Sequence, residues 1–136
     1  MSSDSYRTAK VNLKGDVLVA DDVEQVRSLV ARFLGVLGYS ALQVSNGAEA
    51  VALYRRRQGE VLLVILDVEM PVMGGLEALS ALREINPAVK AIIMSGTCSG
   101  EEVRREVRSG EVAFIRKPFT FEAFNDTVLT VLAGQS

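Results

Sequence analysis

Five short apolar segments, separated from one another by amphipathic stretches, constrain the fold of this 136-residue chain more than any other feature. The segments are rich in the Val, Ile and Leu residues that favour β-strands. They occupy residues 17–20, 41–44, 61–66, 91–94 and 112–115. Strands joined through helices run parallel, and an unbroken apolar run such as VLLVIL suits a sheet covered on both faces. The sequence therefore predicts an α/β fold, a doubly wound (βα)5 domain whose five-stranded parallel sheet has helices on both faces.

The intervening stretches carry apolar residues at the three-and-four spacing of a helix with one buried face. The first helix is predicted to end near Gly38 and to bury Val26, Leu29, Val30, Phe33, Leu34 and Leu37. Asn46 and Ser99 each precede a glutamate by three residues, which marks the starts of the second and fourth helices. The third predicted helix is lined by Leu76, Leu79, Leu82 and Ile85. The fifth is lined by Phe121, Phe124, Val128, Leu129 and Leu132.

The composition indicates one compact domain, since 49% of the residues are hydrophobic. We expect a flexible tail over residues 1–14, the folded domain over residues 15–133, and a short C-terminal tail over residues 134–136. The longest apolar run is too short to cross a membrane, and the polar start resembles no secretory signal, so a cytoplasmic location is expected. A net charge of -2 with both signs interspersed predicts no nucleic acid or membrane partner.

The absence of histidine removes several kinds of chemistry from consideration. Histidine-based acid–base catalysis, the Ser-His and Cys-His nucleophile pairs and zinc sites that use histidine are all excluded. Cys98 is the single cysteine, so an internal disulfide is impossible. Chemistry in this chain must rest on carboxylates, hydroxyls, lysine or a hard metal ion.

Polar side chains follow four of the predicted strands. Asp21 and Asp22 come after the first, Asp67 after the third, Ser95 after the fourth and Lys117 after the fifth. In a doubly wound sheet these carboxyl ends share one edge, which is where such folds bind their ligands. An isolated acid in a loop is more often a helix cap, but the coincidence at four strand ends favours a common site.

Converging carboxylates repel one another, and this either raises a pKa or demands a cation. Oxygen ligands without His or Cys favour a hard divalent ion, and a loose set that leaves room for water suits Mg²⁺. Lys117 adds a compact positive charge and Ser95 a hydroxyl donor. A pocket of this kind suits a dianion, and the reaction it favours is phosphoryl transfer to an aspartate.

The motifs VLVADD, LDVEMPVMGG, IIMSG and FIRKPF occur in the order and spacing of one known family. Over roughly residues 15 to 133 the chain resembles the response-regulator receiver domains of two-component signalling, which have a flavodoxin-like fold. The resemblance implies that Asp67 is the phosphoacceptor and that Asp22 binds Mg²⁺ directly. Asp21 would bind the metal largely through water, and the backbone carbonyl of Glu69 would complete the protein's share of the coordination.

The resemblance also assigns the remaining strand-end residues. Lys117 would pair with the phosphoryl oxygens, and the peptide bond to Pro118 would be cis. The Ser95 hydroxyl would bond the phosphoryl group. Phe114, three residues before the lysine, would turn inward together with Ser95 after phosphorylation, although a phenylalanine simply packed in the core is the alternative.

The resemblance makes the chain a signalling domain that catalyses only its own phosphorylation and dephosphorylation. With no histidine in the chain, the phosphodonor is expected to be a histidine kinase or a histidine phosphotransfer domain. The predicted fourth helix has few apolar residues beyond Val103 and Val107, so it is expected to move. Its surface, with the fifth strand and fifth helix, would switch on phosphorylation and contact a downstream protein or a second copy of the chain.

Two other functions remain open from the sequence. One is a receiver-like interaction module that binds partners without phosphate. The other is a phosphohydrolase of the haloacid dehalogenase type, which usually has a second Asp two positions after the nucleophile, where this chain has Glu69. The sequence also leaves open whether the domain is a free-standing regulator or the receiver of a hybrid histidine kinase.

Overall fold

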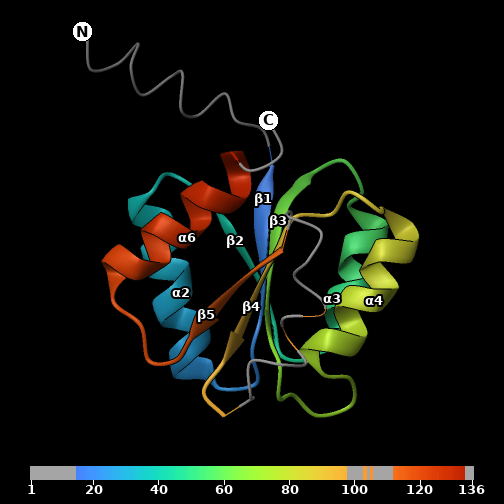
Figure 1. Ribbon diagram of the computed structural model, residues 1–136. Coiled ribbons are helices and arrows are strands. Elements are labelled where there is room, and N and C mark those ends of the chain that lie inside the picture. The colour runs from blue at the N-terminus through green and yellow to red at the C-terminus, as the bar shows by residue number, and fades with distance from the viewer. Residues whose placement is uncertain (1–14, 98–102, 104, 106–111, 134–136) are drawn as a thin grey trace, which may run out of the picture.

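A computed structural model of the chain describes residues 15–97, 103, 105 and 112–133. Within them five parallel strands form one sheet in the order β2-β1-β3-β4-β5 (Figure 1). The strands are β1 (Asp16–Ala20), β2 (Ala41–Val44), β3 (Val61–Asp67), β4 (Ala91–Ser95) and β5 (Val112–Arg116). The helices whose two ends lie among the described residues are α2 (Glu24–Val36), α3 (Gly47–Arg56), α4 (Gly75–Ile85) and α6 (Phe121–Ala133). The predicted doubly wound parallel fold is confirmed.

Helices cover both faces of the sheet, α2 and α6 on one side and α3 and α4 on the other (Figure 1). Successive residues of a strand face opposite sides, so a continuous apolar strand fills two cores. In β3, Leu63 and Ile65 pack with the α2–α6 cluster, whereas Val64 and Leu66 pack with the α3–α4 cluster. This alternation is the physical reason that VLLVIL contains no polar residue.

Parts of two predictions lie outside the described residues. These are the tails at 1–14 and 134–136 and most of the predicted fourth helix. Val103 and Arg105 are described there, and both are helical. Val103 is 2% exposed and belongs to the α3–α4 cluster, and the predicted movement of that helix remains a prediction.

The buried face of α6 differs from the predicted one at two positions, Leu129 and Val131. Phe124 and Val128 are fully buried as expected, but Leu129 is 55% exposed and Val131 is 2% exposed. The prediction for Leu129 was therefore wrong. The buried residues follow the spacing four then three, so the face continues from Val128 to Val131 and leaves Leu129 on the solvent side.

All described helices are short, and the longest, α2 and α6, have 13 residues each. A helix needs about 20 predominantly apolar residues to cross a bilayer. Among the described residues, none of the helices has the length and apolar character for such a span.

The predicted start of the helix at Asn46 is confirmed. The Glu49 amide donates to Asn46 Oδ1 at 2.9 Å, and the Glu49 carboxylate accepts from the amide and hydroxyl of Ser45. The glutamate thus reaches back to the residue before the cap, a variant of the reciprocal capping box. The bond to Asn46 satisfies the Glu49 amide, which the first turn of α3 leaves without a helical partner.

Replacing Asn46 by alanine should lower the free energy of unfolding by about 1 kcal/mol, because the Glu49 amide loses its partner. Chemical denaturation monitored by circular dichroism measures the change. Asn125→Ala, on the middle of α6, is a suitable control because it removes the same amide away from a helix start. An effect no larger than that of the control would contradict the capping role.

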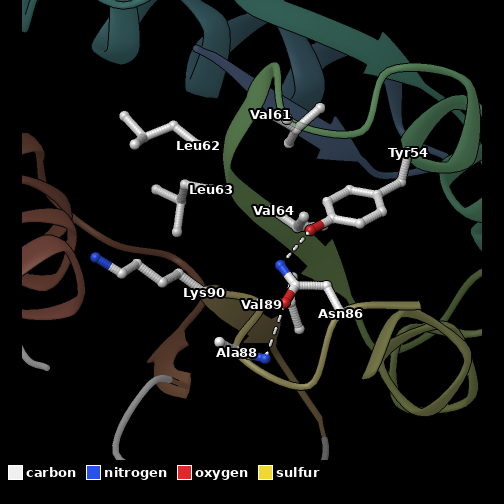
Figure 2. A pocket seen from close by; sticks show the side chains of 10 residues that line it. Tyr54, Val61, Leu62, Leu63, Val64, Asn86, Ala88, Val89 and Lys90 are labelled. Atoms are coloured by element: carbon white, nitrogen blue, oxygen red, sulfur yellow. Dashed lines mark hydrogen bonds between the residues drawn. The ribbon is translucent and has the colours of Figure 1, made fainter. Parts of the chain in front are cut away.

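The cavity in Figure 2 lies at the amino end of β3, away from the predicted site at its carboxyl end. It has a volume of about 190 Å³ and is lined by residues 61–64 of β3, the end of α3 and the loop before β4. The Asn86 side chain spans it, since its Nδ2 donates to the Tyr54 hydroxyl at 2.9 Å and its Oδ1 accepts from the Ala88 amide. These bonds join α3 to the α4–β4 loop. We therefore interpret the residues that line this cavity as structural.

Candidate functional site

The sheet brings the strand-end residues together at one edge. Strands β1 and β3 are neighbours, and Ala20 lies opposite Leu66, so the turn at Asp21 lies beside Asp67. On the other side of β3, Asp67 pairs with Met94, which precedes Ser95. Ser95 is in turn opposite Arg116, and Lys117 follows directly. The chain leaves β1 and β3 towards opposite sides, and this change of direction opens the site between their loops.

Three carboxylates lie close together at this edge of the sheet. Asp21, Asp22 and Asp67 each offer an oxygen that lies within 4.8 Å of the other two. Asp21 is completely buried and Asp67 is 3% exposed, whereas Asp22 is exposed. Two of the acids are thus removed from water, and the third faces solvent at the rim.

Lys117 lies between the two buried acids. Its Nζ donates to Asp21 Oδ2 at 2.9 Å and lies 3.1 Å from Asp67 Oδ1. The second contact is an ion pair without good hydrogen-bond geometry, and Asp67 Oδ1 is a buried oxygen that no described residue hydrogen-bonds. A buried carboxylate oxygen without a hydrogen bond is costly, and it marks a position where a ligand would be stabilised.

The environment raises the pKa of Asp67 to about 6. Burial is the largest cause, and the negative charge of Asp21 adds to it, while Lys117 acts in the opposite direction. The pKa of Lys117 is also raised. Burial by itself would lower it, but the hydrogen bond to Asp21 and the attraction to both Asp21 and Asp67 outweigh that effect. Lys117 therefore stays positively charged, and Asp67 is an electrostatically unfavourable anion without a further cation.

The hydroxyl side of the site contains a contact that the sequence did not predict. Ser95 is completely buried, and its Oγ accepts from the Thr97 amide at 3.2 Å. Thr97 Oγ1 donates to Glu69 Oε2 at 2.7 Å, which ties the loop after β4 to the loop after β3. The only sequence signal was that both residues lie two positions beyond a strand-end site residue. Such spacing does not reveal a bond across 28 positions of sequence.

Phe114 and Pro118 flank the lysine. Phe114 is half-buried and packs against the α3–α4 cluster, so its place in this structure agrees with the packed alternative. Its predicted turn after phosphorylation remains a prediction. The Lys117–Pro118 peptide bond is cis, and the Lys117 amide donates to the Ser95 carbonyl at 2.9 Å.

The donor set suits Mg²⁺. Every donor in the cluster is a carboxylate oxygen, the donor type that this hard cation prefers. Asp67 Oδ1 is buried without a hydrogen bond, and exposed Asp22 leaves one side open to water. Partial hydration is characteristic of protein-bound Mg²⁺. The residues that would hold it are Asp21, Asp22 and Asp67, with the Glu69 carbonyl as the fourth protein ligand from the sequence prediction.

Comparison with known proteins gives a consistent result. A family model described as the response regulator receiver domain matches residues 17–129. The chemotaxis protein CheY of Halobacterium salinarum is 31% identical over 118 residues, which cover 87% of this chain and 97% of that protein. The autoinducer 1 sensor kinase/phosphatase LuxN of Vibrio campbellii is 35% identical over 112 residues, covering 82% of this chain. The match spans only 13% of LuxN.

Solved structures show the same fold. The CheX–CheY complex of Borrelia burgdorferi with BeF3 and Mg²⁺ contains a chain that matches with a TM-score of 0.79 and 26% sequence identity. The match covers 86% of the present chain and 88% of that chain. Both the sequence and structure comparisons therefore cover the sheet and the edge where the three acids meet.

Proposed function

Because this chain belongs to the family of response regulator receiver domains, the signalling modules of two-component systems, we propose that it accepts a phosphoryl group on Asp67. The observation that carries the proposal is a buried oxygen of this carboxylate that forms an ion pair but no hydrogen bond with a described residue. Asp67 Oδ1 is buried, makes no hydrogen bond to a described residue and lies 3.1 Å from Lys117 Nζ. A nucleophilic oxygen beside a fixed cation is the arrangement that phosphoryl transfer requires.

In the proposed reaction an Asp67 oxygen attacks phosphorus, and the bond from phosphorus to the donor's leaving group breaks as the new P–O bond forms. Lys117 neutralises charge on the phosphoryl oxygens. Its ammonium group is positioned for this role before the reaction, because the ion pair with Asp21 holds it at 2.9 Å. The Ser95 hydroxyl donates to another of these oxygens. The product is an acyl phosphate, which adds about 1.5 to 2 negative charges at this edge.

We assign a Mg²⁺ site to Asp21, Asp22, Asp67 and the Glu69 carbonyl. When bound, the ion would offset the charge on the acids and on the transferred phosphoryl group. The raised pKa of Asp67 supports this assignment, because it means that the protein alone compensates the carboxylates incompletely. The Mg²⁺ named in the matched CheX–CheY complex is a second line of support.

Receiver domains pair with histidine kinases or with phosphotransfer partners. We propose a phosphohistidine of such a partner as the donor, because this domain contains no histidine and the phosphoryl group must come from another domain or another chain. The phosphorylated domain would then shift the surface formed by the β4–β5 segment, β5 and α6 towards a downstream partner.

A phosphate-independent interaction module is the second candidate, since such a module could have the same fold. The full set of acids, lysine and hydroxyl at one edge argues against it. The haloacid dehalogenase alternative is disfavoured, because Glu69 is exposed and its carboxylate accepts from Thr97 instead of lying free to act as an acid.

The decisive experiment is phosphoryl uptake from acetyl phosphate, measured as intact mass with and without Mg²⁺. We expect a gain of one phosphoryl group that requires the metal, and reduction of the acyl phosphate with borohydride followed by peptide mapping should locate it at Asp67. Uptake that is unaffected by chelation would refute the metal assignment. An unchanged mass under every condition would favour the phosphate-independent module.

A further inference from the structure

Each polar group of Asp21 makes a hydrogen bond, and together these bonds hold the residue in one position and orientation. Its amide donates to the Val44 carbonyl at 3.2 Å, and its Oδ1 accepts from the Val23 amide at 2.8 Å. Its Oδ2 accepts from Lys117. Its backbone carbonyl accepts from Nη1 of Arg27 at 2.8 Å. Three of these four bonds come from backbone or from a residue already assigned to the site, whereas the Arg27 bond comes from a side chain with no role so far.

Asp22, by contrast, has an exposed carboxylate with no hydrogen bond or ion pair among the described residues. Nothing but its backbone therefore keeps this carboxylate near the other two. The peptide unit that joins residues 21 and 22 contains the carbonyl that accepts the hydrogen bond from Arg27. Rotation of that peptide would redirect the Asp22 side chain, so the Arg27 bond fixes the direction in which Asp22 is presented.

We propose that Arg27 is a positioning residue for Mg²⁺ binding, which clamps the Asp21 carbonyl and thereby aims the Asp22 carboxylate at the metal position. This inference rests on the proposed function, because it needs that metal site. Arg27 lies one turn into α2, so its backbone is anchored by helical bonds, including its amide to the Val23 carbonyl at 3.0 Å. The clamp thus ties the acidic turn to the body of the first helix.

Arg27 is half-buried, and among the described residues the hydrogen bond of its guanidinium goes to the Asp21 carbonyl. It borders an open depression of about 180 Å³ together with Gln43, Ser45 and Glu49. Glu49, the acid in this lining, is engaged by Ser45 and makes no ion pair with Arg27 in the described structure. The charge-assisted bond to the Asp21 carbonyl is therefore the polar contact that orients the guanidinium.

Charge and positioning predict opposite effects of removing Arg27. A positive charge near the acids repels Mg²⁺, so losing that charge without any structural change would tighten metal binding. Losing the clamp would weaken it, because groups that orient metal ligands typically contribute about 10- to 100-fold to affinity. The direction of the change in the Mg²⁺ dissociation constant therefore separates the two roles.

The test compares Arg27→Met, Arg27→Lys and Arg32→Met with the wild-type chain. Arg32 is an exposed arginine on the same helix with no partner among the described residues, so its variant controls for loss of a charge. The Mg²⁺ dissociation constant is measured by titration calorimetry without any phosphodonor. Acetyl phosphate uptake is then measured across Mg²⁺ concentrations, and thermal unfolding without metal reports folding.

We expect Arg27→Met to weaken Mg²⁺ binding about 10-fold. Uptake at saturating Mg²⁺ should stay within about twofold of wild type, because no reacting group has changed. Arg27→Lys should recover part of the affinity, since an ammonium can also donate to the carbonyl. Arg32→Met should match wild type.

An unchanged or tighter dissociation constant in Arg27→Met would overturn the proposal. If that variant does not fold, Arg27→Ala decides, because it also removes the donor and alanine favours the helix, and an unchanged or tighter constant there overturns the proposal equally. Failure of the proposed function looks different, because the wild-type chain itself would then bind no Mg²⁺ and take up no phosphoryl group, and the positioning role would fall with it.

Discussion

Asp67→Asn is expected to abolish phosphoryl uptake and at the same time to make the unphosphorylated domain more stable at neutral pH. The first effect follows because an amide is a far poorer nucleophile than a carboxylate. The second follows from the burial of a charge, since Asp67 is 3% exposed and its pKa is raised to about 6. One substitution thus removes the nucleophile and also removes the destabilising effect of its buried charge.

The pH dependence gives the sign of the stability change. The folded chain holds the Asp67 proton more tightly than the unfolded chain, whose carboxyl titrates near 3.8. The wild-type protein should therefore lose stability as the pH rises from about 4 to about 6, by on the order of 2 to 3 kcal/mol. The asparagine side chain of the variant carries no charge, so this loss should be absent from it.

At pH 7.5 without Mg²⁺, the variant should gain about 1 to 3 kcal/mol in the free energy of unfolding. The lower end allows for the weakened attraction to Lys117, which keeps its bond to Asp21. Urea denaturation at pH 4 and 7.5 measures both points. Asp126→Asn, at an exposed position of α6, should show no such gain. Equal stability of Asp67→Asn and wild type at pH 7.5 would show that the buried charge costs nothing.

Gly75→Ala should destabilise the domain by about 2 to 4 kcal/mol and sharply reduce phosphoryl uptake. Gly75 is buried at the start of α4, and a Cβ there would lie 2.3 Å from the carbonyl oxygen of Asp67 and 2.9 Å from its carbonyl carbon. Both contacts involve backbone atoms, which no side-chain rotation can move away. Either α4 or the phosphoacceptor itself must shift, so stability and chemistry fail together.

Gly35→Ala is the matched control for this substitution. Gly35 lies within α2, and a Cβ there would meet nothing within 4 Å. Because alanine favours the helix more than glycine does, this control should gain about 0.5 to 1 kcal/mol. Thermal unfolding and acetyl phosphate uptake of the two variants test the comparison. A Gly75→Ala protein with wild-type stability and uptake would mean that the loop after β3 accommodates the methyl group.

The sequence determined the order of strands and helices because each buried face leaves a periodic record. Strand β3 is continuously apolar because its successive residues pack in two different cores, and Asn46 as a cap residue indicated the start of α3. The same reasoning placed the candidate acids, hydroxyl and lysine at the carboxyl edge, since parallel strands share that edge. It failed at Leu129, where one helical position separates a buried side chain from an exposed one.

Only the tertiary structure decided which of these groups touch. The bond from Lys117 to Asp21 joins residues 96 positions apart, and the bond from Thr97 to Glu69 joins loops that follow different strands. Val72 has a φ of 70°, a backbone conformation that β-branched residues rarely adopt, so its local sequence does not predict it. Its loop is held by the bond from the Gly47 amide to the Met73 carbonyl at 2.8 Å.

The physical reason for this division is the range of the interactions. Periodicity, capping and strand propensity act within a few residues, so the sequence by itself determined the fold class and the candidate site residues. Distances, burial and pKa shifts depend on atoms brought together from all over the chain. The tertiary structure therefore decided that a buried oxygen of Asp67 makes no hydrogen bond to a described residue and that Arg27 donates a hydrogen bond to the carbonyl of Asp21.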